Sequence, residues 1–371
     1  MSEKKKLIAL LANKDDDIYC FRKELIEGFI AEGYDVLVSC PDGEKFELMK
    51  DIGFIYEDVF IDRRGTNVFL DFKLLCHYYR LFKKYKPDIV LTYTSKPNVF
   101  GSLAARWCKI PYINNVTGFG SVIMKNGLMQ KFIMSLFKMA YKKSDCIMFQ
   151  NSTNMQLAKE NNMIGKSYQL IPGSGVALER FPVAPYPKET PIVFNYIGRI
   201  LKDKGVDDYI AAAEIIRKRH PQTEFNMLGF IEPTESHYEQ ILSELEARDI
   251  VHYRGSQNDV RPFIARSHAT IHPSTYGEGM SNVLLESAAV GRPLITTDNP
   301  GCRETVDDNV TGFIYPGGDV DALVEKIEQF IALDYESRKK MGLLGREKIE
   351  KEFSRKLVIS AYLEQIKEIL D

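Results

Sequence analysis

Short apolar runs alternate with amphipathic segments along the first 171 residues. The runs predict buried strands, and apolar residues that recur every three or four positions predict helices. Alternating strands and helices predict a parallel sheet that helices cover on both faces. The predicted strands are 7–12, 34–40, 55–61, 88–92, 112–116 and 146–149, with one more ending at Ile171; the predicted helices include 19–32, 69–85, 99–109 and 128–143.

A stretch rich in proline and glycine, 172–191, interrupts this pattern and predicts a linker between domains. A second alternation follows, with strand-like runs that begin near 192, 224, 250, 269, 292 and 312. Amphipathic helices are predicted near 320–333, 336–353 and 356–370. We therefore expect two doubly wound, Rossmann-like α/β domains, 1–171 and 192–353, facing each other across a cleft, with the helix 354–371 packing back on the first domain. Ligands in such sheets bind beyond the carboxyl ends of the strands.

Composition narrows the class of protein. The 371 residues are 44% apolar and 27% charged, which suits a two-domain globular chain. The six cysteines are scattered without a C-x-x-C pair, so we expect a reduced, cytoplasmic chain without a zinc site. The net charge of -2 argues against a nucleic-acid partner. No apolar run is long enough to suggest a signal peptide or a membrane span.

The segment 272–298 carries the most specific chemistry. A predicted strand ends at Pro273, a loop with glycines follows, and a helix is expected to start near Ser281, a good N-cap residue. A helix N-terminus suits a phosphate, and Gly279 allows its backbone to approach a ligand closely. Glu278 at the mouth of the loop is placed to hold sugar hydroxyls, and Glu286, one turn into the helix, those of a ribose. The alternative is that both carboxylates only stabilise the helix dipole.

A second loop, 198–205, follows the first strand of the second domain and opens a helix. Arg199 and Lys204 should therefore project from the carboxyl end of that strand. Two cations in this position can neutralise a diphosphate leaving group without a metal ion. The alternative is a pair of solvated surface cations.

Both loops belong to a longer ordered pattern over 192–315: "GR…KG" at Arg199 and Lys204, Gly229, "YRG", "PS", the E-x7-E pair, "GRPLITTD" and "NPGCRETV". This pattern resembles the nucleotide-sugar-binding domain of the family 4 retaining glycosyltransferases, which have the GT-B fold. In the front half, "DIYCFR", "DIVLTYTSKPNVFGSLAA" and "TGFGS" are similar to the branch that builds polysaccharides and lipid-linked oligosaccharides. The nearest group transfers N-acetylhexosamine or galactose to a polyprenyl-diphosphate sugar.

The resemblance implies a UDP-sugar donor, a lipid-linked saccharide acceptor and no cofactor or metal. Arg199 and Lys204 would bind the diphosphate, Glu278 the donor sugar and Glu286 the ribose. The anomeric configuration would be retained through same-face attack, with the departing phosphate taking the acceptor's proton. The remaining donor-side residues would be Gly198, Gly229, Arg254, Gly255, Ser274, Gly279, Met280, Ser281, Asn282 and Val283. The acceptor side would include Asp17, Tyr19, Arg22, Lys96, Thr117, Gly118 and Gly120.

The chain departs from the family pattern in two places. "NKDDDIY" replaces a glycine-rich loop after the first strand, and "NNVTGFGS" lacks the histidine that many relatives present to the acceptor. Asp17 is expected to cap the next helix, with a role in admitting a substrate as the alternative. His268 and His272 flank a buried strand and are interpreted as structural core residues, with His272 as the one nearer the cleft. The spacing of the histidines fits no metal site.

A basic amphipathic helix is predicted to begin at Leu128 and end at Lys143. Lys131, Ser135, Lys138 and Lys142 form one stripe, and no acidic residue occurs from 121 to 144. Such a helix can lie in a membrane interface, or it can be an ordinary packed helix with solvated lysines. A lipid-linked acceptor favours a peripheral contact with the inner membrane surface.

The sequence thus predicts a retaining, metal-independent glycosyltransferase that extends a lipid-linked glycan in bacterial surface-polysaccharide assembly, such as capsule or O-antigen. Two alternatives remain open. One is a GT-B nucleotide-sugar epimerase, and the other is a non-catalytic protein that binds a nucleotide sugar.

Overall fold

The computed structural model describes residues 5–63, 65, 67–119, 127–188 and 190–371. Their contacts divide the chain into two compact units. Unit 1 comprises Met1–Gly175 and Arg355–Asp371, and unit 2 comprises Val176–Ser354. Most of the stretch interpreted as a linker, from Val176 onward, is part of unit 2, where Val176 and Phe181 are buried in an apolar cluster.

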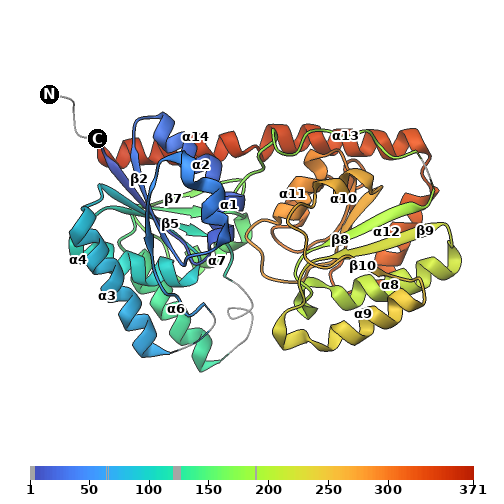
Figure 1. The fold of residues 1–371 in the computed structure, drawn as a ribbon, viewed down its shortest axis with the longest axis horizontal. Helices are drawn as coiled ribbons and strands as arrows, with labels where there is room; N and C mark the ends of the chain where they lie inside the picture. Colours follow the sequence, from blue (N-terminus) through green and yellow to red (C-terminus); the bar gives the residue numbers. More distant parts are fainter. Residues whose placement is uncertain (1–4, 64, 66, 120–126, 189) are drawn as a thin grey trace. The chain divides into compact units, whose positions relative to one another are not determined.

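Unit 1 contains a parallel sheet of seven strands in the order β3-β2-β1-β4-β5-β6-β7 (Figure 1). Successive residues of the central strand face opposite sides, because Ile8 and Leu10 join one apolar cluster while Ala9 and Leu11 join another. The strand order reverses at β1 and β4, which makes the carboxyl ends of these two strands the topological switch point. The strands are β1 (Leu7–Leu11), β2 (Asp35–Cys40), β3 (Ile55–Asp58), β4 (Ile89–Tyr93), β5 (Tyr112–Val116), β6 (Cys146–Phe149) and β7 (Ser167–Leu170).

Helices cover both faces of this sheet, as the alternating pattern predicts (Figure 1). One face is covered by α1 (Asp15–Phe21), α2 (Lys23–Ala31), the 3-10 helix η1 (Glu44–Ile52) and α14 (Arg355–Leu370). The other is covered by α3 (Val68–Tyr85), the π-helical turn η2 (Pro97–Gly101), α4 (Ser102–Cys108), α6 (Leu128–Tyr141) and α7 (Ser152–Glu160).

Unit 2 repeats the architecture with six parallel strands in the order β10-β9-β8-β11-β12-β13. The strands are β8 (Ile192–Ile197), β9 (Thr223–Leu228), β10 (His252–Tyr253), β11 (Ala269–His272), β12 (Leu294–Thr297) and β13 (Gly312–Tyr315). One face packs on α8 (Val206–Arg219), α9 (His237–Ala247) and α12 (Val320–Ala332). The other packs on α10 (Arg261–Arg266), α11 (Asn282–Ala289) and α13 (Tyr335–Glu352). Short 3-10 turns are η3 (Lys202–Lys204), η4 (Pro233–Glu235) and η5 (Arg303–Thr305).

The first helical region differs from the prediction. It begins at Asp15 and breaks at Arg22, so the helix expected over 19–32 is two helices, α1 and α2. Asp17 is not the N-cap, which is Lys14; Asp17 lies in the first turn, where a carboxylate also favours the helix dipole. At this break the Arg22 guanidinium lies 4.2 Å from the centre of the Tyr93 ring.

The last helix, α14, is fastened to unit 1 by buried polar contacts. The Tyr362 hydroxyl accepts a hydrogen bond from Asn115 Nδ2 at 2.6 Å, and Gln150 Nε2 donates to Asn115 Oδ1 at 3.0 Å. Arg355 donates to Glu24 Oε2 at 2.5 Å. A Cβ atom at Gly28 of α2 would lie 2.8 Å from Ile359 Cγ2, so the two helices pack closely. The carboxyl-terminal helix therefore completes the core of a sheet that begins at Leu7.

We expect Tyr362→Phe to lower the free energy of unfolding by about 1–3 kcal/mol, because it leaves the buried Asn115 amide without this acceptor. Urea unfolding measures the loss. Tyr168→Phe is the matched control, because the Tyr168 side chain is exposed on β7, and its effect should stay within about 0.5 kcal/mol. Equal losses in the two variants would contradict the structural role of the Tyr362 hydroxyl.

Candidate functional site

The predicted donor-side residues of unit 2 lie at the carboxyl edge of its sheet. β8 is the strand at which the order reverses, with β9 on one side and β11 on the other. Arg199 follows β8, Gly229 follows β9, Gly255 follows β10, and Ser274 follows β11. This is the position in which doubly wound sheets bind ligands.

Lys204 and Glu278 meet at this edge as a mostly buried ion pair. Ser274 Oγ donates to Glu278 Oε1 at 3.3 Å, and His272 Nε2 lies 3.8 Å from the same oxygen. Burial alone would raise the pKa of Glu278, but the charge and hydrogen bond of Lys204 and the nearby His272 outweigh it and lower the pKa to about 2. Glu278 is therefore an ionised carboxylate at neutral pH.

The two loops that carry this pair are tied together. The Thr275 N–H donates to Asp203 O at 3.1 Å, and Lys204 Nζ lies 4.7 Å from the centre of the Tyr276 ring. Gly205 has a φ of +73°, and a Cβ atom there would lie 2.1 Å from Pro273 O. A glycine is therefore required where the loop after β8 crosses the loop after β11.

Arg199 is the second cation of the site. Its Nη1 donates to Glu232 Oε1 at 2.9 Å, and the Glu232 side chain is only 2% exposed. Burial would lower the pKa of Arg199, but the hydrogen bond to Glu232 and the neighbouring Tyr276 raise it. The Arg199 guanidinium lies 5.7 Å from the centre of the Tyr276 ring, which Lys204 also approaches. Both cations are thus held beside one aromatic ring, each paired with a carboxylate.

The N-terminus of α11 is organised by a histidine. Ser281 occupies the N-cap position, as predicted, but its hydroxyl makes no capping bond and instead lies 3.1 Å from His272 Nε2. His272 is buried, and its Nδ1 has no hydrogen-bond partner among the described residues. Burial lowers the pKa of His272, although the nearby Glu278 carboxylate opposes this, so the ring is neutral at physiological pH. His272 thus connects the cap of α11 to the ion pair.

The backbone around the start of α11 is held by the loop after β12. The Ser281 N–H donates to Gly301 O at 2.8 Å, so in this state it is not offered to a ligand. A Cβ atom at Gly301 would lie 2.7 Å from Gly279 O, which shows how closely the two loops pack. Met280 is buried, while Asn282, Val283 and Glu286 are half-buried on α11.

The segment expected to lie near the base is also at this edge. The Gly229 N–H donates to Gly255 O at 2.9 Å, and the Tyr253 hydroxyl donates to Gly229 O at 2.8 Å. A Cβ atom at Gly229 would lie 1.7 Å from Gly198 O, so only glycine fits there. Arg254 donates from Nε to Asn226 Oδ1 at 2.7 Å. The structure therefore brings Gly198, Gly229 and Gly255 together, with Arg254 beside them.

The predicted acceptor residues gather at the carboxyl edge of the sheet of unit 1. Asp17, Tyr19 and Arg22 belong to or follow α1, which starts after β1. Burial raises the pKa of Asp17, and the charge of Arg22 opposes the shift. Lys96 follows β4 and pairs with Asp71 of α3 at 2.5 Å. Thr117 and Gly118 follow β5, and Gly120 lies outside the described residues.

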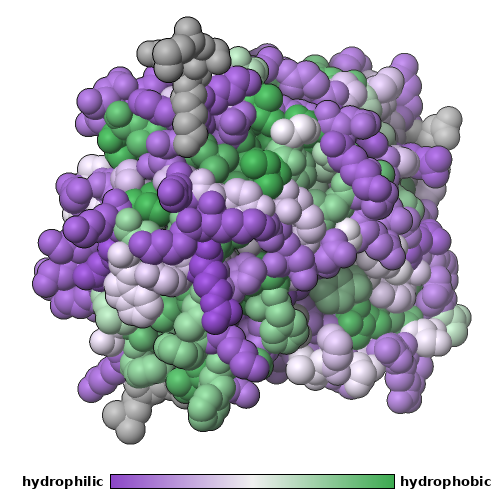
Figure 2. All heavy atoms as spheres, turned by 60° about the vertical axis from the view of Figure 1, so that its left-hand side comes forward, coloured by the Kyte–Doolittle hydropathy of each residue, from purple (hydrophilic) through white to green (hydrophobic). Residues whose placement is uncertain are grey.

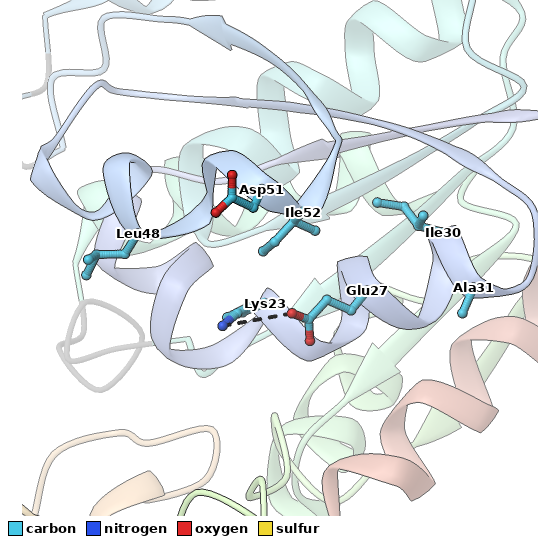
Figure 3. Close-up of a pocket in the computed structure, with 7 residues that line it drawn as sticks. All are labelled: Lys23, Glu27, Ile30, Ala31, Leu48, Asp51 and Ile52. Carbon is cyan, nitrogen blue, oxygen red and sulfur yellow. Dashed lines mark ion pairs between the residues drawn. The ribbon is translucent and has the colours of Figure 1, made fainter.

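Unit 1 also has a groove that other residues line. It is formed between α2 and η1, where Lys23 and Glu27 form an ion pair at 3.8 Å (Figure 3). None of the predicted acceptor residues lines it. Its lining residues are Lys23, Glu27, Ile30, Ala31, Leu48, Asp51 and Ile52.

Three site residues were not recognised from the sequence as parts of one site. Glu232 follows β9, and its link to Arg199 depends on β9 and β8 being neighbours, which the sequence pattern does not specify. Tyr276 directly precedes Gly277 of the loop but carries no motif of its own. The sequence indicates only a structural role for His272, but its contact with Ser281 shows that it also lies beside the site. His268 has the structural role expected for it, since its Nδ1 accepts from the Val193 N–H at 3.0 Å.

Neither a metal centre nor a membrane span emerges from the described ranges. Within them, no group of three or more histidine, cysteine, aspartate or glutamate side chains could hold a metal ion. Within the same residues, no helix is both long and apolar enough to cross a bilayer.

Comparison with known families gives two matches that follow each other along the chain. Residues 7–151 match the model of the "Glycosyl transferase 4-like" family, and residues 179–348 match that of the "Glycosyl transferases group 1". Together they include both switch points described above.

Comparison with curated proteins gives relatives of similar length. The N,N'-diacetylbacillosaminyl-diphospho-undecaprenol alpha-1,3-N-acetylgalactosaminyltransferase of Campylobacter jejuni is 27% identical over 86% of this chain and 88% of its own. The capsular polysaccharide biosynthesis glycosyltransferase CapM of Staphylococcus aureus is 28% identical over 90% of each chain. The UDP-Gal:alpha-D-GlcNAc-diphosphoundecaprenol alpha-1,3-galactosyltransferase of Escherichia coli is 25% identical over 71% of each.

Solved structures share the fold along the whole chain. A glycosyltransferase from Rickettsia africae superposes with a TM-score of 0.78 at 20% identity and covers 99% of each chain. Anabaena HepE, solved with UDP and glucose, superposes with a TM-score of 0.80 at 17% identity, covering 98% of this chain and 100% of its own. These likenesses confirm the GT-B fold that the sequence predicts. The chain therefore belongs to the group 1, family 4-like glycosyltransferases of the GT-B fold, and it is a glycosyltransferase.

Proposed function

We propose that this enzyme transfers a hexose or an N-acetylhexosamine from a UDP-sugar to a polyprenyl-diphosphate-linked saccharide, with retention of the anomeric configuration and without a metal ion. The observation that carries the proposal is the pairing of Lys204 with Glu278, next to Arg199, at the switch point of unit 2. The printed activities of the Campylobacter and Escherichia coli relatives, which act on undecaprenyl-diphosphate sugars, support the choice of acceptor.

The donor diphosphate would bind at the carboxyl edge of the unit 2 sheet, where positive charge is concentrated. Lys204 and Arg199 both lie beside Tyr276 of the loop that leads into α11, and the N-terminus of α11 carries a partial positive charge. In the free enzyme each cation is neutralised by a carboxylate, so neither is an unpaired buried charge. When the diphosphate binds, the two cations turn to its oxygens and stabilise the charge that develops as UDP leaves.

Glu278 is suited to hold the donor sugar rather than to attack it. Its carboxylate is ionised and fixed by Lys204, Ser274 and the nearby His272, which leaves a rigid acceptor for sugar hydroxyls. In the reaction that we propose, the acceptor hydroxyl attacks the anomeric carbon from the face that the diphosphate leaves. The bond from the anomeric carbon to the phosphate oxygen breaks, the new glycosidic bond forms, and the departing phosphate takes the hydroxyl proton.

The lipid-linked acceptor places the enzyme at the inner face of the cell membrane. The helix predicted to contact that surface is α6, and the stripe of Lys131, Ser135, Lys138 and Lys142 is exposed, as a membrane-facing stripe requires. Acidic residues are absent from this helix, so its charge suits anionic lipids.

A panel of UDP-sugars offered with a polyprenyl-diphosphate monosaccharide, with and without EDTA, tests the proposal. We expect one donor to give a product one sugar heavier, with the donor's anomeric configuration and equal rates under both conditions. Product mass and the anomeric coupling constant measure this. Inversion, or strict dependence on a divalent ion, would contradict the mechanism. UDP-sugar conversion without acceptor would indicate an epimerase, and tight UDP binding without turnover a non-catalytic binding protein.

Removal of the buried pair separates catalysis from folding. Lys204→Ala alone leaves the Glu278 carboxylate without its cation, which costs about 3–5 kcal/mol of stability. A loss of activity in that variant could therefore come from unfolding. We therefore expect the double variant Lys204→Met/Glu278→Gln to fold with nearly unchanged stability and to lose about 100-fold or more in kcat/KM. Lys202→Met in the same turn is the matched control, because Lys202 is exposed and should leave turnover unchanged. Normal turnover by the double variant would refute the site.

The neutral His272 makes stability depend on pH. Because the pKa of His272 is lower in the folded protein than the ordinary 6.5, unfolding takes up a proton at acidic pH. Its contribution is fully present above pH 6.5 and is lost as the pH falls below 6.5 towards the folded-state pKa. We expect the free energy of unfolding to fall more steeply from pH 7.5 to 5.5 for the wild type than for His272→Gln. Urea titrations at several pH values measure the two slopes, and parallel curves would contradict a neutral, buried ring.

A further inference from the structure

We infer that the outer face of the layer formed by α3, α4 and α6 is a membrane-binding surface, with the first turns of α3 and α6 inserted among the lipid headgroups. We call this face the aromatic-basic face. It consists of the exposed side chains of these three helices and is wider than the single helix predicted from the sequence. The inference rests on the proposed function only in its choice of a membrane-embedded acceptor.

The first observation is an unusual exposure of large apolar side chains. Among the described residues, the aromatic side chains that are more than half exposed all lie in unit 1. Four of them belong to the aromatic-basic face, and Val68 stands beside them at the start of α3. The exposed fractions are Val68 72%, Phe69 82%, Phe72 61%, Trp107 58% and Phe132 59%. A soluble surface normally hides such groups, and a cluster of them marks an interaction site.

These side chains form one surface, because the three helices pack side by side. The Tyr79 and Trp107 rings meet edge to face at 6.4 Å, which joins α3 to α4. Arg106 of α4 donates to Met139 O of α6 at 2.8 Å. Figure 1 shows α3, α4 and α6 together on one side of the sheet, and both α3 and α6 begin at the bottom of the view. Figure 2 shows hydrophobic side chains gathered at the lower edge of the face that it presents, among hydrophilic ones.

The second observation is the charge of the same helices. Within the bounds of α3, α4 and α6 the sequence has seven lysines and arginines and a single carboxylate, Asp71. Asp71 is already paired with Lys96, and Lys84 is paired with Glu57. Lys73, Arg80, Lys83, Lys131 and Lys138 are exposed. The face therefore combines aromatic side chains with a strong excess of positive charge.

This combination favours an anionic bilayer over a second copy of the chain. Two copies that met through the same face would bring like charges together, which opposes association. An anionic lipid surface attracts each nearby lysine or arginine by about 1 kcal/mol, and exposed phenylalanine and tryptophan rings partition into the headgroup region. At an anionic membrane the charge and the aromatic rings both favour binding, whereas between two copies of the chain the charge opposes it.

The placement of the face suits an acceptor held in the bilayer. The first turns of α3 and α6 lie at the carboxyl edge of the sheet, because α3 follows β3 and α6 follows β5. The predicted acceptor residues Arg22 and Lys96 lie at the same edge, and Lys96 contacts Asp71 in the first turn of α3. Insertion of Phe69, Phe72 and Phe132 would therefore set this edge against the headgroups, where the diphosphate of a polyprenyl-linked saccharide lies.

Vesicle flotation of the full chain tests the inference. The probes are vesicles of phosphatidylcholine alone and of phosphatidylcholine mixed with phosphatidylglycerol, each at low and at high salt. We expect binding to the anionic vesicles at least about tenfold stronger than to the neutral ones, and weaker at high salt. Phe69→Ser/Phe72→Ser should weaken it by about tenfold or more. Leu48→Ser/Leu357→Ser is the matched control, because both leucines are exposed in unit 1 but belong to η1 and α14, which cover the opposite face of the sheet.

Each outcome decides the inference. Equal flotation of the two double variants, or binding that ignores lipid charge, would overturn it. So would a wild-type dimer, seen by light scattering, that Phe69→Ser/Phe72→Ser converts to a monomer with no vesicle binding by either form. A wild type that transfers sugar but does not float refutes the surface and leaves the proposed function intact. A wild type that floats but transfers no sugar supports the surface and contradicts the proposed function.

Discussion

The site of unit 2 depends on one constraint, which is that two cations lie close together in a partly buried place and neither can be left unpaired there. Lys204 and Arg199 meet this constraint by pairing with Glu278 and Glu232. The pairing requires the loops after β8, β9 and β11 to lie within a few ångströms of one another, and glycines make that approach possible. At Gly205 and Gly229 a side chain would collide with backbone oxygens of the neighbouring loops. The strand order, the glycines and the ion pairs are therefore parts of one arrangement.

The arrangement also explains why ordinary structural residues lie beside the chemistry. His272 is the last residue of β11, and its buried ring reaches both the N-cap of α11 and the carboxylate of Glu278. Tyr276 presents its ring to both cations. Such residues fix the distance between the helix N-terminus and the charges, and in the proposed reaction the stabilisation of the transition state would depend on that distance.

Much of this fold could be predicted from the sequence, and the failures have physical causes. β5 and β6 agree with the prediction at both ends. β6 is a short apolar run between two polar neighbours, and β5, although it contains two asparagines, begins directly after Pro111. The start of α1 differs from the prediction because three aspartates hide its first turn from any apolar period. The contact that Arg22 makes at the break is with Tyr93, a residue far along the chain. In the site, Arg199, Lys204 and Glu278 stand out by motif. Their pairing, and the role of Glu232, depend on which strands are neighbours in the sheet. The local hydrophobic pattern does not specify that order.

The route of the chain through the two units has a consequence for biosynthesis. Unit 1 is built from the first 175 residues and the last 17, and unit 2 is a continuous stretch between them. As the ribosome makes the protein, unit 2 has all of its strands and helices before unit 1 receives α14. Until then the apolar side chains of unit 1 that pack against Val358, Tyr362 and Ile366 have no cover. The nascent amino-terminal half must therefore remain partly open until α14 is made, and during that interval it is most exposed to aggregation or to chaperones.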